Sequence, residues 1–168
     1  MQTYTGRKFF PTSPNADDIC IADIAHALSL HCRFNGHTRV FYSVAEHSVR
    51  VSNMLPDSLR LWGLMHDSAE AYTGDIIRPI KMLLPDAEAM EDAILRVIAD
   101  KYGLSWPMPA EVHMADDIVL MTEKRDIMGQ SPHDWEIQIE PLPGKIEPWT
   151  AESSEAAFLD KFRELSGS

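Results

Sequence analysis

The sequence has few cysteines, few basic residues and no long apolar run, and each shortage excludes a class of protein. Cys20 and Cys32 are its two cysteines among 168 residues, too few for a small fold held together by disulfides. No stretch is apolar for long enough to span a bilayer, and no signal peptide is recognisable, so we expect a protein of the reducing cytoplasm with no membrane partner. No linker, low-complexity tract or repeat divides the chain, which predicts a single domain over residues 1–168.

Basic side chains are the scarcer charged kind, with 15 Lys and Arg against 26 Asp and Glu and a net charge of -11. This sign opposes the phosphate contacts on which DNA and RNA binding depends, so we expect no polymeric nucleic acid as a partner. The acidic excess lies wholly in residues 82–168, because residues 1–81 carry eight basic and eight acidic side chains. The balanced N-terminal half can therefore hold a local positive pocket.

Helical periodicity dominates what is present, and it predicts an all-α fold. Apolar residues at i, i+3, i+4 and i+7 predict helices over about 18–31, from Ser43 to Pro56, over about 58–72, from Asp86 to Gly103, from Pro109 onward and over about 151–165. At the start of the second of these helices we expect a capping box, in which the Glu46 carboxylate reaches back to the backbone of Ser43. The core should cover about 18–128, with the loop and helix over 130–165 packed on it.

Two features are candidates for chemistry: His47 on an apolar helix face, and the adjacent pair His66-Asp67 in the middle of the next predicted helix. A single histidine on such a face is usually hydrogen-bonded packing. The adjacent pair differs, because neighbouring helical positions diverge by about 100° and a metal ion at the helix surface lies between the two directions. Imidazole nitrogen together with carboxylate oxygen suits Zn, Mn, Fe, Co or Ni better than Ca.

The order of His47, then His66-Asp67, then an aspartate on a later helix resembles the H…HD…D signature of the HD-domain metal-dependent phosphohydrolases. Around these residues, the segments 45–48, 64–76 and 115–116 are similar to stretches of bacterial 5′-deoxynucleotidases and of small phage-type HD hydrolases of deoxynucleotides. The resemblance covers about Ala22 to Arg125. It implies an HD-domain helical bundle with the metal site between helices.

The resemblance implies one divalent transition metal ion (Mn, Co, Zn, Fe or Ni) held by His47, His66, Asp67 and Asp116. Asp117 is the rival for the fourth position. A mononuclear site fits better than a dinuclear one, because the helix of His66 supplies no second histidine. Mg can accompany the substrate phosphates.

Glu70 and Asp75 are the candidate catalytic carboxylates. Glu70 follows His66 by four residues and Asp67 by three, so it shares their helix face and can exchange a proton with attacking water or the leaving oxygen. The matching Glu and Asp are catalytic in the deoxynucleotidase-like members, which implies the same roles here. The alternatives are a solvated Glu70 and an Asp75 that caps the chain after the helix.

Arg33, Phe34 and Lys81 are the candidate substrate contacts. Arg33-Phe34 matches an arginine-aromatic pair that lies beside the nucleotide in the deoxynucleotidases, which implies that Phe34 stacks on the base or sugar. Lys81 follows Asp75 on a predicted loop and is the second cation expected to bind phosphate. For each cation the alternative is an ordinary surface charge.

Together these residues imply hydrolysis at the 5′ phosphorus of a deoxynucleotide, with release of the deoxynucleoside. The segment 33–38 is more similar to the phage-type group, which favours a dNTP triphosphohydrolase acting on a substrate such as dATP. A 5′-deoxynucleotidase acting on dNMPs is the alternative. A non-catalytic nucleotide-binding HD module and a phosphohydrolase of another ester remain as further readings. We also expect a homo-oligomer, because related small HD proteins associate.

Overall fold

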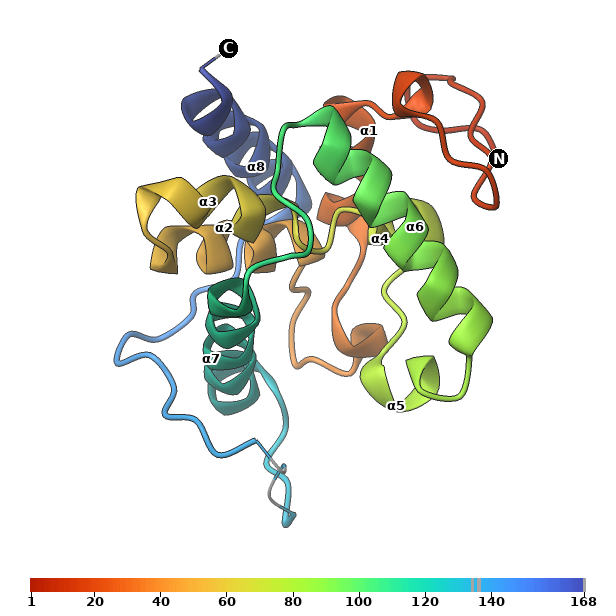
Figure 1. Ribbon diagram of the computed structural model, residues 1–168. Helices are drawn as coiled ribbons and strands as arrows, with labels where there is room; N and C mark the ends of the chain where they lie inside the picture. The colour runs from red at the N-terminus through yellow and green to blue at the C-terminus, as the bar shows by residue number, and fades with distance from the viewer. Residues whose placement is uncertain (134, 136, 168) are drawn as a thin grey trace.

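The computed structural model describes residues 1–133, 135 and 137–167, and helices make up its architecture (Figure 1). The α-helices of these residues are α1 Ile21–Leu30, α2 Val44–Met54, α3 Asp57–Met65, α4 Glu70–Thr73, α5 Arg78–Lys81, α6 Pro85–Lys101, α7 Ala110–Ile127 and α8 Ala151–Ser166. Two short 3₁₀ turns, Ala16–Asp18 and Phe34–Gly36, precede α1 and α2. Over the same residues β pairing is limited to isolated bridges, such as that between Cys32 and Ser43. The all-α prediction is confirmed.

Helix α2 lies at the centre of the bundle and contacts α1, α3, α7 and α8. The hydrophobic core around it draws on each of these helices, with Leu28, Trp62, Val119 and Phe158 among its members. A helix enclosed in this way can carry a buried polar side chain only where neighbouring groups form hydrogen bonds with that side chain. None of the helices that the structure describes is both long and apolar enough to cross a bilayer.

Helix α3 runs back against α2 at a distance that only glycine allows. A Cβ atom on Gly63 would lie 2.5 Å from the Cδ1 of Leu55 and 2.9 Å from the Cα of Ser52. Real Cβ atoms do not approach other atoms so closely. The absence of a side chain at Gly63 is therefore what allows α3 to pack this close to α2. The close approach carries the end of α3, and with it His66, up to α2.

The predicted helix over about 58–72 is wrong in its middle, because α3 ends at Met65 and α4 begins at Glu70. Between them, the amides of Ser68 and Glu70 each donate to a carbonyl three residues earlier, both at 3.0 Å, which is the tighter 3₁₀ spacing. The Ser68 hydroxyl also donates to the Met65 carbonyl at 2.6 Å and competes with the regular helical pattern. Asp67 therefore lies in a turn, and His66 caps the end of α3.

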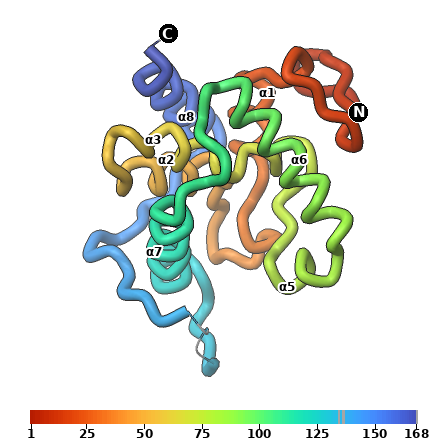
Figure 2. Tube along the Cα trace, in the orientation of Figure 1, coloured from red at the N-terminus to blue at the C-terminus, as the bar shows by residue number. Residues whose placement is uncertain are grey.

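The connection from α7 to α8 is held to both α7 and α2. Arg125 donates to the Leu142 carbonyl at 2.6 Å, and Asp126 accepts the Ile146 amide at 2.8 Å. The Glu46 carboxylate accepts the Trp149 amide at 2.8 Å. These bonds lead the chain to α8, which packs against α1, α2 and α3 and can be followed in Figure 2.

One half of the predicted capping box is present and the other half is wrong. The Ser43 hydroxyl accepts the Glu46 amide at 3.0 Å, as predicted. The Glu46 carboxylate does not return to Ser43, because Arg50 and the Trp149 amide donate to it instead. The sequence pattern suggested a nearby partner for the Glu46 carboxylate, whereas Trp149, about a hundred residues later, provides one.

Candidate metal centre

Four side chains from α2, the end of α3 and α7 meet inside the bundle. The Nε2 atoms of His47 and His66 lie 3.2 Å apart, and Asp67 Oδ2 lies 3.6 Å from the first and 3.1 Å from the second. Asp116 Oδ1 lies 3.1 Å from His47 Nε2. The structure thus brings together the four residues that the sequence predicts as ligands, although they span seventy residues of chain.

The other ring nitrogen of each histidine is fixed by an acceptor. His66 Nδ1 donates to the Gly63 carbonyl at 2.8 Å, and His47 Nδ1 donates to Glu123 Oε1 at 2.7 Å. A carbonyl or carboxylate only accepts, so each Nδ1 carries a proton, and each Nε2 can offer a lone pair to a metal ion once it is deprotonated. The two Nε2 atoms face the same small space, where a bound cation would take the place of a proton.

The donor set fits a divalent transition metal. The ligand atoms of His47, His66 and Asp67 all lie within 4.8 Å of one another, so one ion can reach all three. Two imidazoles and up to two carboxylates make the mixed nitrogen and oxygen set that Zn, Mn, Fe, Co and Ni accept. This buried group can hold a metal ion, and the donor chemistry leaves its identity open.

Asp116, rather than Asp117, faces the two histidines. The carboxylate of Asp117 instead lies toward the exposed Arg78, with Oδ1 3.8 Å from Nη2 of that arginine. The geometry therefore favours Asp116 as the fourth ligand. Burial raises the pKa of Asp116, but His47 and His66 lower it further, to a net value of about 2.

The neighbouring charges keep the centre strongly polarised. Burial raises the pKa of Asp67, yet His66, His47 and Arg33 together hold it well below its usual range. Burial and Arg33 lower the pKa of His47, whereas Glu123 and Asp116 outweigh them and raise it to about 9. The carboxylates of Asp67 and Asp116, whose pKa values are lowered, are therefore ionised at neutral pH and available as ligands.

Arg33 reaches this centre from the turn after α1. It is 8% exposed, its Nε donates to Glu123 Oε2 at 3.2 Å, and its Nη1 donates to Asp67 Oδ2 at 3.5 Å. The guanidinium is thus a buried cation at the edge of the candidate metal site. This position excludes the ordinary surface charge that was the alternative for Arg33.

Phe34 lies beside Arg33 but also takes part in packing. Its ring centroid is 5.3 Å from the Arg33 guanidinium carbon, and the ring packs against a small cluster of Tyr42, Ile127 and Ile146. Its backbone has φ of 55°, a left-handed conformation that side chains rarely adopt. The half-buried ring is close enough to Arg33 to meet a substrate bound there.

Glu70 is buried at the same centre, as its spacing from His66 and Asp67 predicts. It is 5% exposed, and its Oε2 atom has no hydrogen-bond partner among the described residues. Burial, Asp67 and Asp75 raise its pKa well above the usual range. The solvated Glu70 that was the alternative is excluded.

Asp75 and Lys81 flank Glu70 in different ways. Burial raises the pKa of Asp75, which feels the charges of Arg33 and Asp67 and so lies near the centre. Lys81 Nζ lies 3.8 Å from Glu70 Oε1 but only 2.7 Å from Glu91 Oε1 on α6. The predicted phosphate ligand thus already has a carboxylate partner on α6.

Glu123 is the residue of this centre that sequence reasoning missed. It is fully buried and joins His47 to Arg33 without being a candidate ligand itself. It lies seven residues after Asp116, two helical turns further along the same face of α7. The signal in the sequence that could have indicated Glu123 was a carboxylate at a position on the inward, otherwise apolar face of its helix.

Comparison with known proteins gives two relatives. The uncharacterized protein YfdR of Escherichia coli (strain K12) is 41% identical over 170 residues, covering 99% of this chain and 95% of that protein. An uncharacterized protein of Rhodobacter capsulatus is 31% identical over 158 residues, covering 86% of this chain and 79% of that protein. No protein-family model matches the chain. Identity of this level over nearly the whole of both chains shows that the chain belongs to the family of YfdR.

Proposed function

We propose that this chain is a metal-dependent phosphohydrolase of the HD-domain type, which hydrolyses deoxynucleotides at the 5′ phosphorus and releases the deoxynucleoside. The observation that carries the proposal is the convergence of two imidazole Nε2 atoms and two carboxylates beside a buried arginine and a buried glutamate, whose Oε2 has no hydrogen-bond partner among the described residues. The order of the residues, His47, His66-Asp67 and Asp116, also resembles the HD signature.

A bound divalent ion supplies positive charge for the phosphoryl group and lowers the pKa of water. Arg33 is placed to add charge next to it, because its guanidinium already touches Asp67. The guanidinium has more N–H groups than its contacts to Glu123 and Asp67 use, so it can also bind a phosphate oxygen. Phe34 then lies beside the sugar or base.

Glu70 and Asp75 handle protons in this proposal. A raised pKa means that the Glu70 carboxyl keeps its proton at a higher pH than an ordinary glutamate and can give it to the leaving oxygen. Two carboxyl groups in one buried site cannot both ionise easily, which keeps one of them protonated. Asp75 is the partner that orients the water.

Two substrates fit this chemistry, and the resemblance of residues 33–38 to the phage-type enzymes favours the triphosphate. Attack at the α-phosphorus of a dNTP releases triphosphate and a deoxynucleoside. Attack on a dNMP releases inorganic phosphate and the same deoxynucleoside, which would make the protein a 5′-deoxynucleotidase. A binding module with an idle metal would release neither, and it has no need of a buried Glu70.

The test is product analysis by chromatography, after incubation of the purified protein with Mn or Co and each dNMP or dNTP. Deoxynucleoside with triphosphate is the expected result. Deoxynucleoside with inorganic phosphate, formed from monophosphates alone, would assign the nucleotidase reaction instead. No turnover of any nucleotide by protein with metal bound would contradict the proposal.

Replacing Asp67 should remove both metal and turnover, because it contributes a ligand atom within reach of both histidines. Elemental analysis after dialysis and the product assay measure the two effects for Asp67→Ala. The control is Asp117→Ala, since Asp117 is a carboxylate next to Asp116 on α7 but pairs with Arg78. Full metal content and activity in Asp67→Ala would remove Asp67 from the ligand set.

A further inference from the structure

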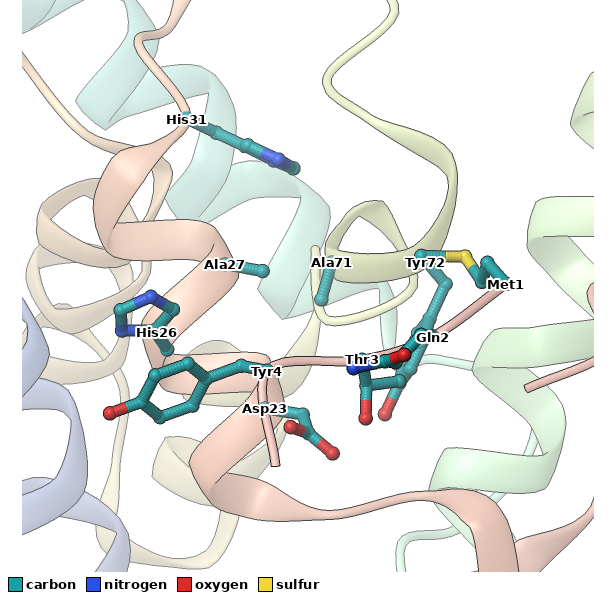
Figure 3. Close-up of a pocket in the computed structure, with 10 residues that line it drawn as sticks. All are labelled: Met1, Gln2, Thr3, Tyr4, Asp23, His26, Ala27, His31, Ala71 and Tyr72. Carbon is teal, nitrogen blue, oxygen red and sulfur yellow. The ribbon is translucent and has the colours of Figure 1, made fainter. Parts of the chain in front are cut away.

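A hollow of about 420 Å³ opens between α1 and α4 (Figure 3). The two helices contact each other and form its walls, and residues 1–4 of the chain cover one side. Figure 3 shows His31 at one end, Ala27 and Ala71 in the middle and the Tyr4 and His26 rings at the other end. This volume is in the range of small-molecule sites.

Two residues that line the hollow are close in sequence to residues of the candidate metal centre. His31 ends α1, and Arg33 follows it by two residues. Ala71 follows Glu70 in α4. His31 also feels the charge of Asp75, which lies near Glu70 and Arg33. The hollow is therefore built on α1, which leads to Arg33, and on α4, which carries Glu70.

Two polar groups that line the hollow lack a hydrogen-bond partner among the described residues, His31 Nδ1 and the Tyr72 hydroxyl. His31 Nδ1 is buried and accepts or donates no hydrogen bond within the described part of the chain. Burial lowers the pKa of His31, so the ring is neutral at neutral pH and offers one donor and one acceptor nitrogen. An unpaired buried nitrogen is costly unless a ligand supplies its partner.

The rest of the lining suits a flat, aromatic group. The small side chains of Ala27 and Ala71 leave room between the helices. Tyr4 and His26 stack with centroids 3.6 Å apart and planes 13° apart, so they present an ordered aromatic surface at one end. Planar heterocycles bind such places by ring contacts together with hydrogen bonds at their edges.

We propose that this hollow is the nucleobase subsite, which holds the base of the deoxynucleotide whose 5′ phosphate lies at the metal centre. The assignment rests on the proposed function and deepens it. His31 hydrogen-bonds an edge of the base, Ala27 and Ala71 flank its faces, and base preference resides in these residues rather than in the metal ligands.

The kinetic test uses substitutions that fill the hollow or change its polar edge. Both positions lie outside the set of metal ligands. Ala27→Leu occupies the space from α1, and His31→Gln alters the polar edge; Ala156→Leu and His113→Gln are controls at exposed positions on α8 and α7. We expect KM for the preferred nucleotide to rise about tenfold or more in the first pair, the loss expected for a buried polar contact or blocked site. Inhibition by inorganic tripolyphosphate, which has no base, should stay unchanged.

A binding measurement on EDTA-treated protein separates this inference from the proposed function. Deoxynucleosides are titrated while the ring C–H signals of His31 and His26 are followed by NMR, with assignments from substitutions of each histidine. We expect both signals to shift in the wild type, those of His113 to stay fixed, and the His26 shift to vanish in Ala27→Leu.

The outcomes of the two measurements are distinguishable. Nucleotide hydrolysis with an unchanged KM in folded Ala27→Leu and His31→Gln would overturn the subsite and leave the proposed function standing. Deoxynucleoside binding that Ala27→Leu abolishes, in a protein that hydrolyses no nucleotide, would support the subsite and overturn the hydrolase. Shifts caused equally by base-free deoxyribose 5-phosphate would overturn the assignment of the hollow to the base.

Discussion

At the scale of single residues, the candidate metal centre depends on a side chain that is not one of its ligands. Glu123 receives the Nδ1 proton of His47 on one oxygen and the Nε proton of Arg33 on the other. It thereby fixes the direction of the His47 lone pair and the position of the buried guanidinium. The negative charge of Glu123 also balances the buried charge of Arg33, together with that of Asp67.

Glu123→Gln should weaken metal binding about 10- to 100-fold, the usual effect of losing a partner that orients a ligand histidine. The amide keeps a similar shape but removes the charge between His47 and Arg33. Competition with a chelator measures the metal affinity. Glu111→Gln, an exposed substitution on the same helix, is the control, and equal affinities in the two variants would contradict this role for Glu123.

At the scale of elements, the sequence predicted which segments are helical better than where they end. Apolar spacing located α2 and placed His47 on its inner face, because periodicity reports burial directly. The same spacing continued through residues 66–69 and gave no sign of the turn there. That turn depends on hydrogen bonds from His66 and Ser68 to carbonyls three residues earlier, which hydrophobic periodicity does not encode.

The candidate site shows the same limit. His47, His66, Asp67 and Asp116 were found because their order is a recognisable pattern. The pairing of Lys81 with Glu91 was not foreseen, since it depends on how α5 folds back against α6. Contacts between elements far apart in the chain decide such partners, and a single sequence does not state them.

Gly63→Ala should destabilise the protein by about 1–3 kcal/mol, the usual cost of overpacking. In an exposed helix, replacing glycine by alanine would stabilise the protein by up to about 1 kcal/mol. The sign of the change in unfolding free energy therefore reports whether α3 is crowded against Leu55 and Ser52. Denaturant unfolding measures it. Gly129→Ala, where nothing lies within 4 Å of the new Cβ, is the matched control. Stability equal to or above wild type would show that α3 can move away from α2 freely.

The bond between α7 and the following connection should weaken in acid. Arg125 lowers the pKa of Asp126, and the Ile146 amide lowers it further, which together outweigh the opposite effect of burial. A lowered pKa in the folded state contributes stability above the ordinary value of 3.8, and this contribution is lost as the pH falls below that value. The stability difference between wild type and Asp126→Asn should therefore shrink below pH 3.8 in acid unfolding curves. A difference that is constant across this range would contradict the assignment.

At the scale of the whole molecule, a run of exposed apolar side chains lies in α5 and directly after it. Ile80, Met82, Leu83 and Leu84 are 43%, 76%, 78% and 44% exposed, and they surround the half-buried Lys81. Contiguous exposed apolar side chains usually mark an interaction site. We expect a second copy of this chain to cover them, in agreement with the homo-oligomer expected from the sequence.

Leu83→Lys should lower the oligomeric state in solution, because it places a charge in the middle of this apolar segment. Light scattering coupled to size-exclusion chromatography measures the molar mass. Leu30→Lys is the control, since Leu30 is an exposed leucine at the end of α1, away from α5. A mass that is unchanged in Leu83→Lys, or lowered equally in both variants, would place the interface elsewhere.

The packing of α8 against α1, α2 and α3 has a consequence for synthesis on the ribosome. Helix α2 carries His47, and one of its sides is covered only once Phe158 and the rest of α8 have emerged. The Glu46 carboxylate likewise has no amide partner until Trp149 has been synthesised. We therefore expect the growing chain to hold its metal ligands in an incomplete bundle, and to acquire a rigid site only after α8 has been translated.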